Sequence, residues 1–352
     1  MENTREKQRF VDLHCDTIVC EVMRSQGEKK LRHNPEGHLD LERLKAGGSL
    51  LQCLALYIPV VSQKCDFVSR EFEAERTKGR TENWFVKQME ECGSATPDPW
   101  VFFTEAADWF EREVAANADM IRQVKKFEDI EKNAAEGIIS ALMTVEDGVP
   151  LEGDISRVDE MFARGVRMLT LTWNHENTLG FPNKHDPERG LKPFGLEALS
   201  RMNELGIIAD VSHLSDAGFW DVANNTKKPF VASHSNAKAL CPIYRNLTDD
   251  MLRAIAKKGG VTGLNFSADF LVDDSNYTYV KDLVRHARYI ADVAGAETIA
   301  LGSDFDGISC TMEFHDCGGF PMIEEGLNSA FTAREVDMIT HGNALRVMKD
   351  NF

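Results

Sequence analysis

Eight short apolar runs, rich in β-branched residues, recur along the chain and are separated by segments long enough to form helices. They span residues 10–16, 50–58, 138–145, 168–173, 207–211, 230–233, 261–266 and 299–305. Several are almost continuously hydrophobic, which is typical of parallel strands buried on both faces. If the short sixth run counts as a strand, the pattern predicts an α/β fold of the (β/α)8 TIM-barrel type. A doubly wound open sheet is the alternative.

Helical periodicity fills the intervals between these runs. Apolar residues within 280–294 follow a 3–4 spacing that stops at Gly295, which predicts an amphipathic helix ending there. The spacing within 106–114 predicts another helix, with Thr104 as its N-cap. The interval from 61 to 137 is too long for a simple crossover, so we expect two or more extra helices between the second and third strands.

Length and charge narrow the classes of protein that this chain can represent. The 352 residues fit one large barrel, and no Pro-, Gly- or Ser-rich linker divides them, so we expect a single barrel domain over 1–352. The 40 basic and 57 acidic side chains give a net charge of 40 − 57 = −17, which argues against nucleic acids and anionic membranes as partners.

The sequence also predicts a compartment. The start of the chain is polar, no stretch approaches ~18 consecutive apolar residues, and no hydrophobic tail for a lipid anchor is visible. The eight cysteines are scattered without a paired CxxC pattern. We therefore expect a cytoplasmic protein with mostly reduced thiols, although Cys310 and Cys317, which flank a glycine-rich loop, leave a disulfide open.

Ionisable side chains fall at or just after the carboxyl ends of the predicted strands. They are His14, Asp16, Glu146, His175, His213, His234 and Asp304. In an α/β barrel these strand ends meet on one face, where catalytic groups lie. Burying so many ionisable groups without a counter-ion is costly, and a divalent cation removes that cost. Nitrogen and oxygen ligands without thiolate favour zinc, with manganese, cobalt or iron as alternatives.

The remaining histidines carry a simpler interpretation. His33, His38 and His185 lie in polar stretches and are expected to be solvent-facing loop residues. His286 lies inside the predicted amphipathic helix, where packing or hydrogen bonding is the expected role.

Seven motifs occur in the order found in a known family. They are Asp12-Leu-His-Cys-Asp-Thr17, Val145-Glu-Asp-Gly148, Leu171-Thr-Trp-Asn-His175, Asp210-Val-Ser-His213, Ser233-His-Ser-Asn236, Cys241-Pro-Ile-Tyr-Arg-Asn246 and Gly302-Ser-Asp-Phe-Asp-Gly307. Together they resemble the membrane dipeptidase (renal dipeptidase-like) family of dizinc peptidases. The match extends to His341-Gly-Asn-Ala-Leu-Arg346, which begins with His-Gly-Asn where the family more usually has Gly-Gly-Asn.

The resemblance implies a role for each matching residue. His14 and Asp16 would bind one zinc ion, His213 and His234 a second, and Glu146 would bridge the two. His175 would contact the substrate near the scissile amide, Arg245 would hold its terminal carboxylate, and Asp304 would handle protons. The implied reaction is hydrolysis of a dipeptide by a dizinc-bound hydroxide, since metal binding lowers the pKa of water from 15.7 to about 7.

Two other functions are compatible with the same residues. A related amidohydrolase acting on N-acyl amino acids or cyclic amides would keep the same barrel and metals. A barrel that binds metal without turnover would use the acidic surface or the 61–137 interval for a partner. The preferred dipeptides and the acceptance of a D-configured C-terminal residue do not follow from the sequence, and a homodimer is an expectation from the family alone.

Overall fold

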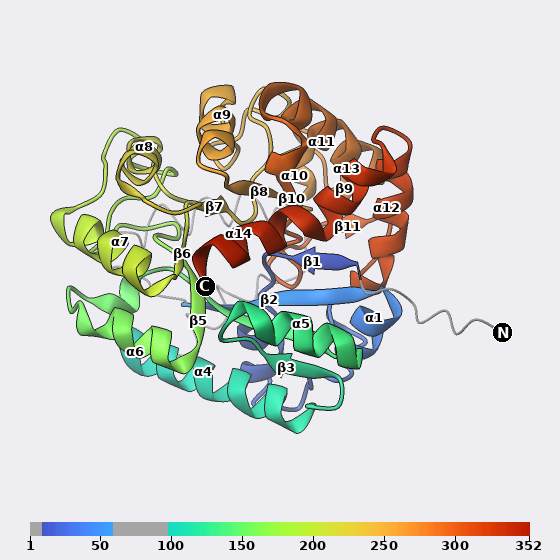
Figure 1. Cartoon of the computed structure of the whole chain (residues 1–352), viewed down its shortest axis with the longest axis horizontal. Coiled ribbons are helices and arrows are strands. Elements are labelled where there is room, and N and C mark those ends of the chain that lie inside the picture. The colour runs from blue at the N-terminus through green and yellow to red at the C-terminus, as the bar shows by residue number, and fades with distance from the viewer. Residues whose placement is uncertain (1–8, 59–97) are drawn as a thin grey trace.

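A computed structural model describes residues 9–58 and 98–352, and eight of its strands form a closed parallel barrel (Figure 1). The barrel strands are β1 (Phe10–Asp12), β2 (Ser49–Tyr57), β4 (Ile139–Glu146), β5 (Val166–Thr170), β6 (Ile208–Asp210), β7 (Val231–Ala232), β8 (Val261–Leu264) and β10 (Ile299–Leu301). Each predicted apolar run contributes one of them. The (β/α)8 prediction is therefore confirmed, and the open-sheet alternative is wrong.

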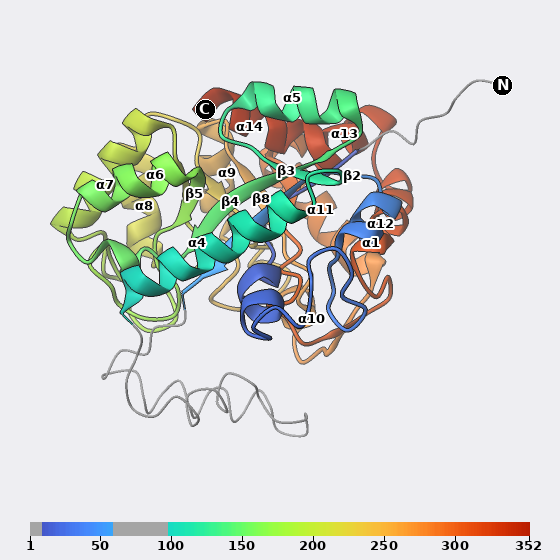
Figure 2. The same ribbon diagram turned by 90° about the horizontal axis from the view of Figure 1, so that it is seen from below.

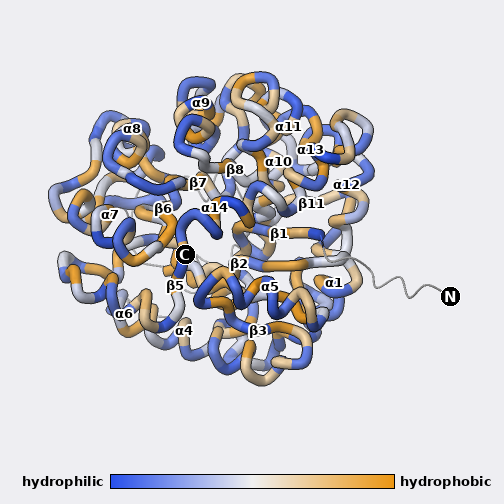
Figure 3. Tube along the Cα trace, viewed as in Figure 1, coloured by the Kyte–Doolittle hydropathy of each residue, from blue (hydrophilic) through white to orange (hydrophobic). Residues whose placement is uncertain are grey.

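Two pairings close the ring. Strand β1 pairs in parallel with β10, where Asp12 lies opposite Leu301, and β2 pairs with β4 over seven residue positions. Every residue of β2 and β4 is buried, because one face packs inside the barrel and the other against helices. Figure 3 shows hydrophobic colouring along β2, whereas the surrounding helices alternate between hydrophilic and hydrophobic positions.

Helices surround the barrel and cover its ends. The α-helices are α1 (Leu41–Ala46), α4 (Pro99–Ala116), α5 (Phe127–Glu136), α6 (Ser156–Arg164), α7 (Pro193–Leu205), α8 (Asp216–Asn225), α9 (Asp249–Lys257), α10 (Ala268–Leu271), α11 (Val280–Ala294), α12 (Phe320–Asn328), α13 (Ala333–Asp337) and α14 (Asn343–Asn351). The predicted helix that ends at Gly295 is α11. Figure 2 shows α14 at one end of the barrel and α10 at the other. No helix in the described ranges is long and apolar enough to cross a membrane.

Shorter elements complete the described chain. They are the π-helical turns η1 (Ile18–Met23) and η5 (Met338–Gly342), the 3-10 turns η2 (Val149–Leu151), η3 (Ala296–Thr298) and η4 (Cys317–Gly319), and the strands β3 (Ile121–Gln123), β9 (Tyr277–Thr278) and β11 (Thr311–Met312). Strands β9 and β11 pair with each other, away from the barrel.

The interval between the second and third barrel strands contains the expected extra helices. Helices α4 and α5 confirm the prediction within residues 98–137, and residues 59–97 lie outside the described part of the chain. Strand β3 lies between these two helices in the chain and was not predicted from the sequence. It pairs with the amino-terminal residues of β4. The proposed N-cap Thr104 is wrong: α4 begins at Pro99, and the Asp98 side chain accepts from the Trp100 amide. Proline favours the first helical position, so the helix starts earlier than its apolar spacing indicates.

Helix α14 closes the amino-terminal end of the barrel. Its residues Ala344, Val347 and Met348 pack into the same buried cluster as strand residues such as Leu51 and Met168. The Asn343 amide donates to the carbonyl oxygens of Ala296 and Ile299, each at 2.8 Å. The motif around 341–346 therefore anchors the chain terminus to the start of β10 and has a structural role.

Replacing Asn343 with Ala should lower the free energy of unfolding by about 2 kcal/mol, because two buried carbonyl groups lose their donor. Chemical denaturation measures the effect. Asn328→Ala is the matched control, since the exposed Asn328 amide donates to one carbonyl within its own helix. If Asn343→Ala costs no more than the control, the anchoring role is wrong.

Candidate metal centre

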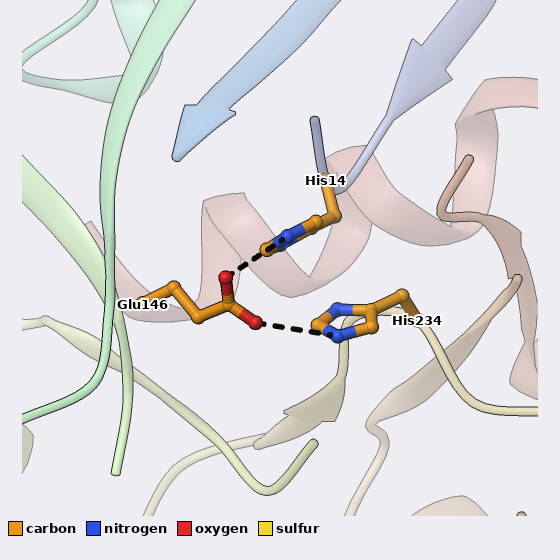
Figure 4. A group of neighbouring side chains, drawn as sticks. All are labelled: His14, Glu146 and His234. Carbon is orange, nitrogen blue, oxygen red and sulfur yellow. Dashed lines mark ion pairs between the residues drawn. The ribbon is translucent and has the colours of Figure 1, made fainter. Parts of the chain in front are cut away.

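Three side chains from distant parts of the chain converge at the carboxyl end of the barrel. His14 follows β1, Glu146 is the last residue of β4, and His234 follows β7. Their potential ligand atoms all lie within 4.8 Å of one another, and all three residues are buried (Figure 4). The barrel topology explains the convergence, because parallel strands bring their carboxyl ends to one face.

Glu146 lies between His14 on one side and the pair His213 and His234 on the other. Its Oε2 atom is 3.7 Å from Nε2 of His14. On the other side, Oε1 is 3.0 Å from Nε2 of His213 and 3.7 Å from Nε2 of His234. The two latter nitrogens are 3.1 Å apart. Each carboxylate oxygen therefore faces a different imidazole group, which is the disposition that a bridging ligand requires.

Asp16 and Asp304 extend the cluster on the side of His14. The ligand atoms of these three residues form a second group within 4.8 Å, and His14 Nε2 is 3.6 Å from Asp16 Oδ2. Asn265 donates to Asp304 Oδ2 at 2.9 Å, and Asp304 adopts a left-handed backbone with φ of 62°. Buried atoms His14 Nε2 and Asp16 Oδ1 have no hydrogen-bond partner in the described structure. Buried ligand atoms without a hydrogen-bond partner are expected where a cation binds.

The electrostatics of the cluster favour the binding of a cation. Burial opposes the charged form of His14, but Glu146 and Asp16 outweigh it and raise its pKa from 6.5 to about 10. Burial, reinforced by Asp16, raises the pKa of Glu146 well above its usual value. Burial also raises the pKa of Asp304 to about 6 and lowers the pKa of His213 well below 6.5. A bound cation would relieve the mutual repulsion of these carboxylates.

Arg245 lies in the loop that follows β7 and His234. Its side chain is 3% exposed, and its Nη1 atom donates to Ser235 Oγ at 3.4 Å. The Nε and Nη2 atoms are buried without a hydrogen-bond partner among the described residues. Burial lowers the pKa of this guanidinium. A buried guanidinium with free donors is suited to receive an anionic group, and a carboxylate matches its planar fork.

His175 joins neither of the two groups that can hold a cation. Its Nε2 atom is 2.9 Å from Oδ2 of Asp147, and both side chains are almost completely buried. Asp147 is in turn held by the amide of Asn177, which donates to its Oδ1 at 2.7 Å. The ring of Trp173 lies 6.0 Å from that of His175 and 6.2 Å from that of His213, which places His175 beside the cluster.

Sequence reasoning missed Tyr57, the last residue of β2. It pairs with Glu146 in the sheet register, and its ring packs edge-on against Trp173 at 5.0 Å. Its hydroxyl is buried and has no hydrogen-bond partner in the described structure. Burial and the nearby Glu146 raise its pKa well above 10. Its position at a strand end was the available signal, because the other candidate residues were selected by the same criterion.

Four histidines were not expected to belong to the metal site, and the structure confirms the expected setting for three of them. His33 and His185 are exposed, and buried His286 contacts the Leu271 carbonyl through Nε2, so these predictions are confirmed. The prediction for His38 is wrong. Its side chain is only 25% exposed, because Nδ1 accepts a hydrogen bond from the amide of Asp306. This bond holds the ring against the loop that contains Asp306.

The cysteine prediction can be checked for six of the eight residues. Cys310 and Cys317 both have free thiols, as do the four other cysteines in the described ranges.

A closed barrel with buried histidines and carboxylates at its carboxyl face is the arrangement typical of metal-dependent hydrolases. Sequence comparison agrees: a family model described as "Membrane dipeptidase (Peptidase family M19)" matches residues 2–351. The chain belongs to this family and is a metallopeptidase of the dipeptidase type.

Individual relatives agree with the family assignment. An uncharacterized protein encoded in the pqqA 5' region of Klebsiella pneumoniae is 36% identical over 247 residues, 67% of this chain and 91% of its own length. Dipeptidase aclJ of Aspergillus oryzae is 29% identical over 288 residues, 78% of this chain and 68% of that protein. A crystal structure of a metallopeptidase from Rhodobacter sphaeroides, liganded with a phosphinate mimic of the dipeptide L-Ala-D-Ala, has a TM-score of 0.85 and 25% identity. The match covers 99% of this chain and 100% of that chain.

Proposed function

We propose that this protein is a dizinc dipeptidase. His14 and Asp16 would hold one zinc ion, His213 and His234 the other, and Glu146 would bridge them. The observation that carries the proposal is the position of Glu146, whose two oxygens face the His14 side and the His213–His234 side separately. We further propose that residues 1–352 act as one domain, since the first and last barrel strands are paired.

The residues fit zinc in their chemistry. Zinc accepts imidazole nitrogen and carboxylate oxygen as ligands, and the cluster supplies only these two atom types. His14 Nε2 and Asp16 Oδ1 are buried without a hydrogen bond to any described residue, and a metal would satisfy both. When bound, two zinc ions would supply Lewis acidity and a water of lowered pKa.

The remaining site residues would bind and orient the substrate. Arg245 would receive the free carboxylate of a dipeptide in its unpartnered fork. His175 lies beside the cluster and would contact the scissile amide and stabilise the oxyanion that develops there. Asp304 stands next to His14 and Asp16 and would take a proton from water and return it to the leaving amine.

A relative supports the choice of substrate. The Rhodobacter sphaeroides metallopeptidase binds a phosphinate mimic of L-Ala-D-Ala, and a tetrahedral phosphinate resembles the intermediate of amide hydrolysis. The similarity spans essentially both chains. A dipeptide with a free C-terminal carboxylate is therefore the substrate class that we propose here, with L-Ala-D-Ala as one member to test.

A substrate panel with metal analysis tests the proposal. Purified protein loaded with zinc should contain two zinc ions per chain and release free amino acids from dipeptides. Chelation should abolish the release, and zinc should restore it. N-acyl amino acids and cyclic amides form the second arm, and faster turnover of these would favour the amidohydrolase alternative. Absence of hydrolysis across the whole panel in fully metallated protein would overturn the proposed activity.

Tyr57 provides a further prediction about the substrate pocket. If its unpartnered hydroxyl binds substrate, Tyr57→Phe should reduce kcat/KM for dipeptides by about 3- to 10-fold, the equivalent of one neutral hydrogen bond. Thermal stability should not fall, because the hydroxyl has no partner to lose among residues 9–58 and 98–352. Tyr289→Phe is the control, since that hydroxyl contacts Asp249 in α9. Unchanged kinetics in Tyr57→Phe would contradict the substrate contact.

A further inference from the structure

Asp210 is a fully buried carboxylate at the end of β6 that receives four hydrogen bonds. The backbone amides of Ser212 and Ser233 donate to its Oδ1 atom at 3.0 and 2.8 Å. The hydroxyls of Thr170 and Ser233 donate to its Oδ2 atom, each at 2.6 Å. An ionised carboxylate accepts about four hydrogen bonds and donates none, so its acceptor sites are filled.

The hydroxyl of Ser233 connects this carboxylate to a ligand of the metal centre. A serine hydroxyl has one proton, and here it points to Asp210. The same oxygen lies 2.7 Å from Nδ1 of His234. Because the proton is already directed elsewhere, Ser233 Oγ can only accept at this contact. The proton between the two residues must therefore belong to Nδ1 of His234.

A neutral imidazole with a proton on Nδ1 has a lone pair on Nε2. In His234 that Nε2 atom faces Glu146 and His213. His213 has the same arrangement, because its Nδ1 lies 3.1 Å from the acceptor Oδ1 of Asn174. Two nitrogen lone pairs and a carboxylate oxygen then meet without a donor between them, which is the condition under which a cation binds.

We propose that Asp210 and Ser233 are positioning residues that set the tautomer of His234 and thereby keep its Nε2 atom available to a metal. The relay runs from the Asp210 carboxylate through the Ser233 hydroxyl to the imidazole. The metal-binding consequence rests on the proposed function, whereas the tautomer itself does not. Outer contacts of this kind orient ligating histidines, and their loss costs about 10- to 100-fold in metal affinity.

A second serine–aspartate pair, after strands β10 and β1, provides a natural control. Ser303 donates to the buried carboxylate of Asp12 through both its hydroxyl, at 2.6 Å, and its amide, at 2.7 Å. However, the other contacts of the Ser303 hydroxyl are with backbone groups, the oxygen of His14 at 3.0 Å and the amide of Phe305 at 3.1 Å. Ser303 thus shares the serine–aspartate pair of the relay but does not touch an imidazole nitrogen in the described structure.

Nitrogen NMR on metal-free protein with labelled histidine tests the tautomer directly. The His234 signals, assigned by their loss in His234→Ala, should show the proton on Nδ1. In Asp210→Asn the amide oxygen should stay with the two backbone donors, so that the NH2 group turns toward Ser233. The Ser233 hydroxyl would then donate to His234 Nδ1, and the proton should move to Nε2. A proton on Nε2 in the unmodified protein would overturn the proposal.

Zinc titration of Ser233→Ala and Ser303→Ala tests the consequence, and both variants avoid the substitution of a carboxylate. Both should lose similar thermal stability, because each loses one buried serine–aspartate hydrogen bond. Only Ser233→Ala should lower the affinity for one of the two zinc ions, by about 10- to 100-fold. Equal weakening in both variants, or in neither, would overturn the relay. If the tautomer is as expected but the unmodified protein binds no zinc, the proposed function fails and the relay stands.

Discussion

Replacing Glu146 with Gln is expected to lower kcat by about 10³-fold and to reduce the zinc content below two ions per chain. The physical reason is that the two carboxylate oxygens face different sides of the centre. An amide has only one oxygen, so its NH2 group must face either His14 or the His213–His234 pair. A group that donates hydrogen bonds cannot ligate a cation, and one side loses its ligand in either orientation.

The fold of this variant should persist. Burial and Asp16 raise the pKa of Glu146, which shows that its charged form is disfavoured in the metal-free protein. A neutral amide removes that cost, so the metal-free variant should melt no lower than the unmodified protein. Glu152→Gln is the control, since Glu152 lies on the same segment but pairs with Arg157 at the surface. Full turnover in Glu146→Gln would show that the bridging role is wrong.

Replacing Arg245 with Met should lower kcat/KM for dipeptides by about 10²-fold or more, largely through KM. Loss of one partner from a buried pair of opposite charges typically costs about 2–5 kcal/mol. Stability should not decrease, because Nε and Nη2 of Arg245 are buried without partners in the described part of the chain, and an apolar side chain of similar length removes this cost.

Amidated dipeptides make this test specific. They lack the terminal carboxylate, so the unmodified protein should hydrolyse them far more slowly than free dipeptides, and Arg245→Met should lose most of this discrimination. Arg253→Met is the control, because Arg253 lies exposed on α9 and pairs only with Asp249 and Asp250 among the described residues. If Arg245→Met still strongly prefers the free carboxylate, another residue binds that group.

The barrel and the location of its site were predictable because both depend on local patterns. Continuous apolar runs identify buried parallel strands, and polar residues just after such runs must lie at one face. The spacing of His14 and Asp16 likewise indicated side chains on the same side, and they lie 3.6 Å apart. Glu146 could be placed by the same criterion because β4 continues to that residue.

Features that depend on distant contacts were less accessible. Strand β3 has only three residues and no strong apolar run, so its pairing with β4 becomes visible only in the fold. His38 is drawn from solvent by Asp306, which lies 268 positions away in the chain. Asp210 and Ser233 occur in recognisable motifs, but their contact joins two strands, and its direction follows from hydrogen bonds that the sequence does not contain.

The pairing of β1 with β10 has a consequence for biosynthesis. On the ribosome, the amino-terminal strand emerges long before its neighbour, and it must wait without a partner on that edge until residues 299–301 leave the exit tunnel. A nascent chain arrested before residues 299–301 emerge should therefore present an open sheet edge that invites chaperone binding.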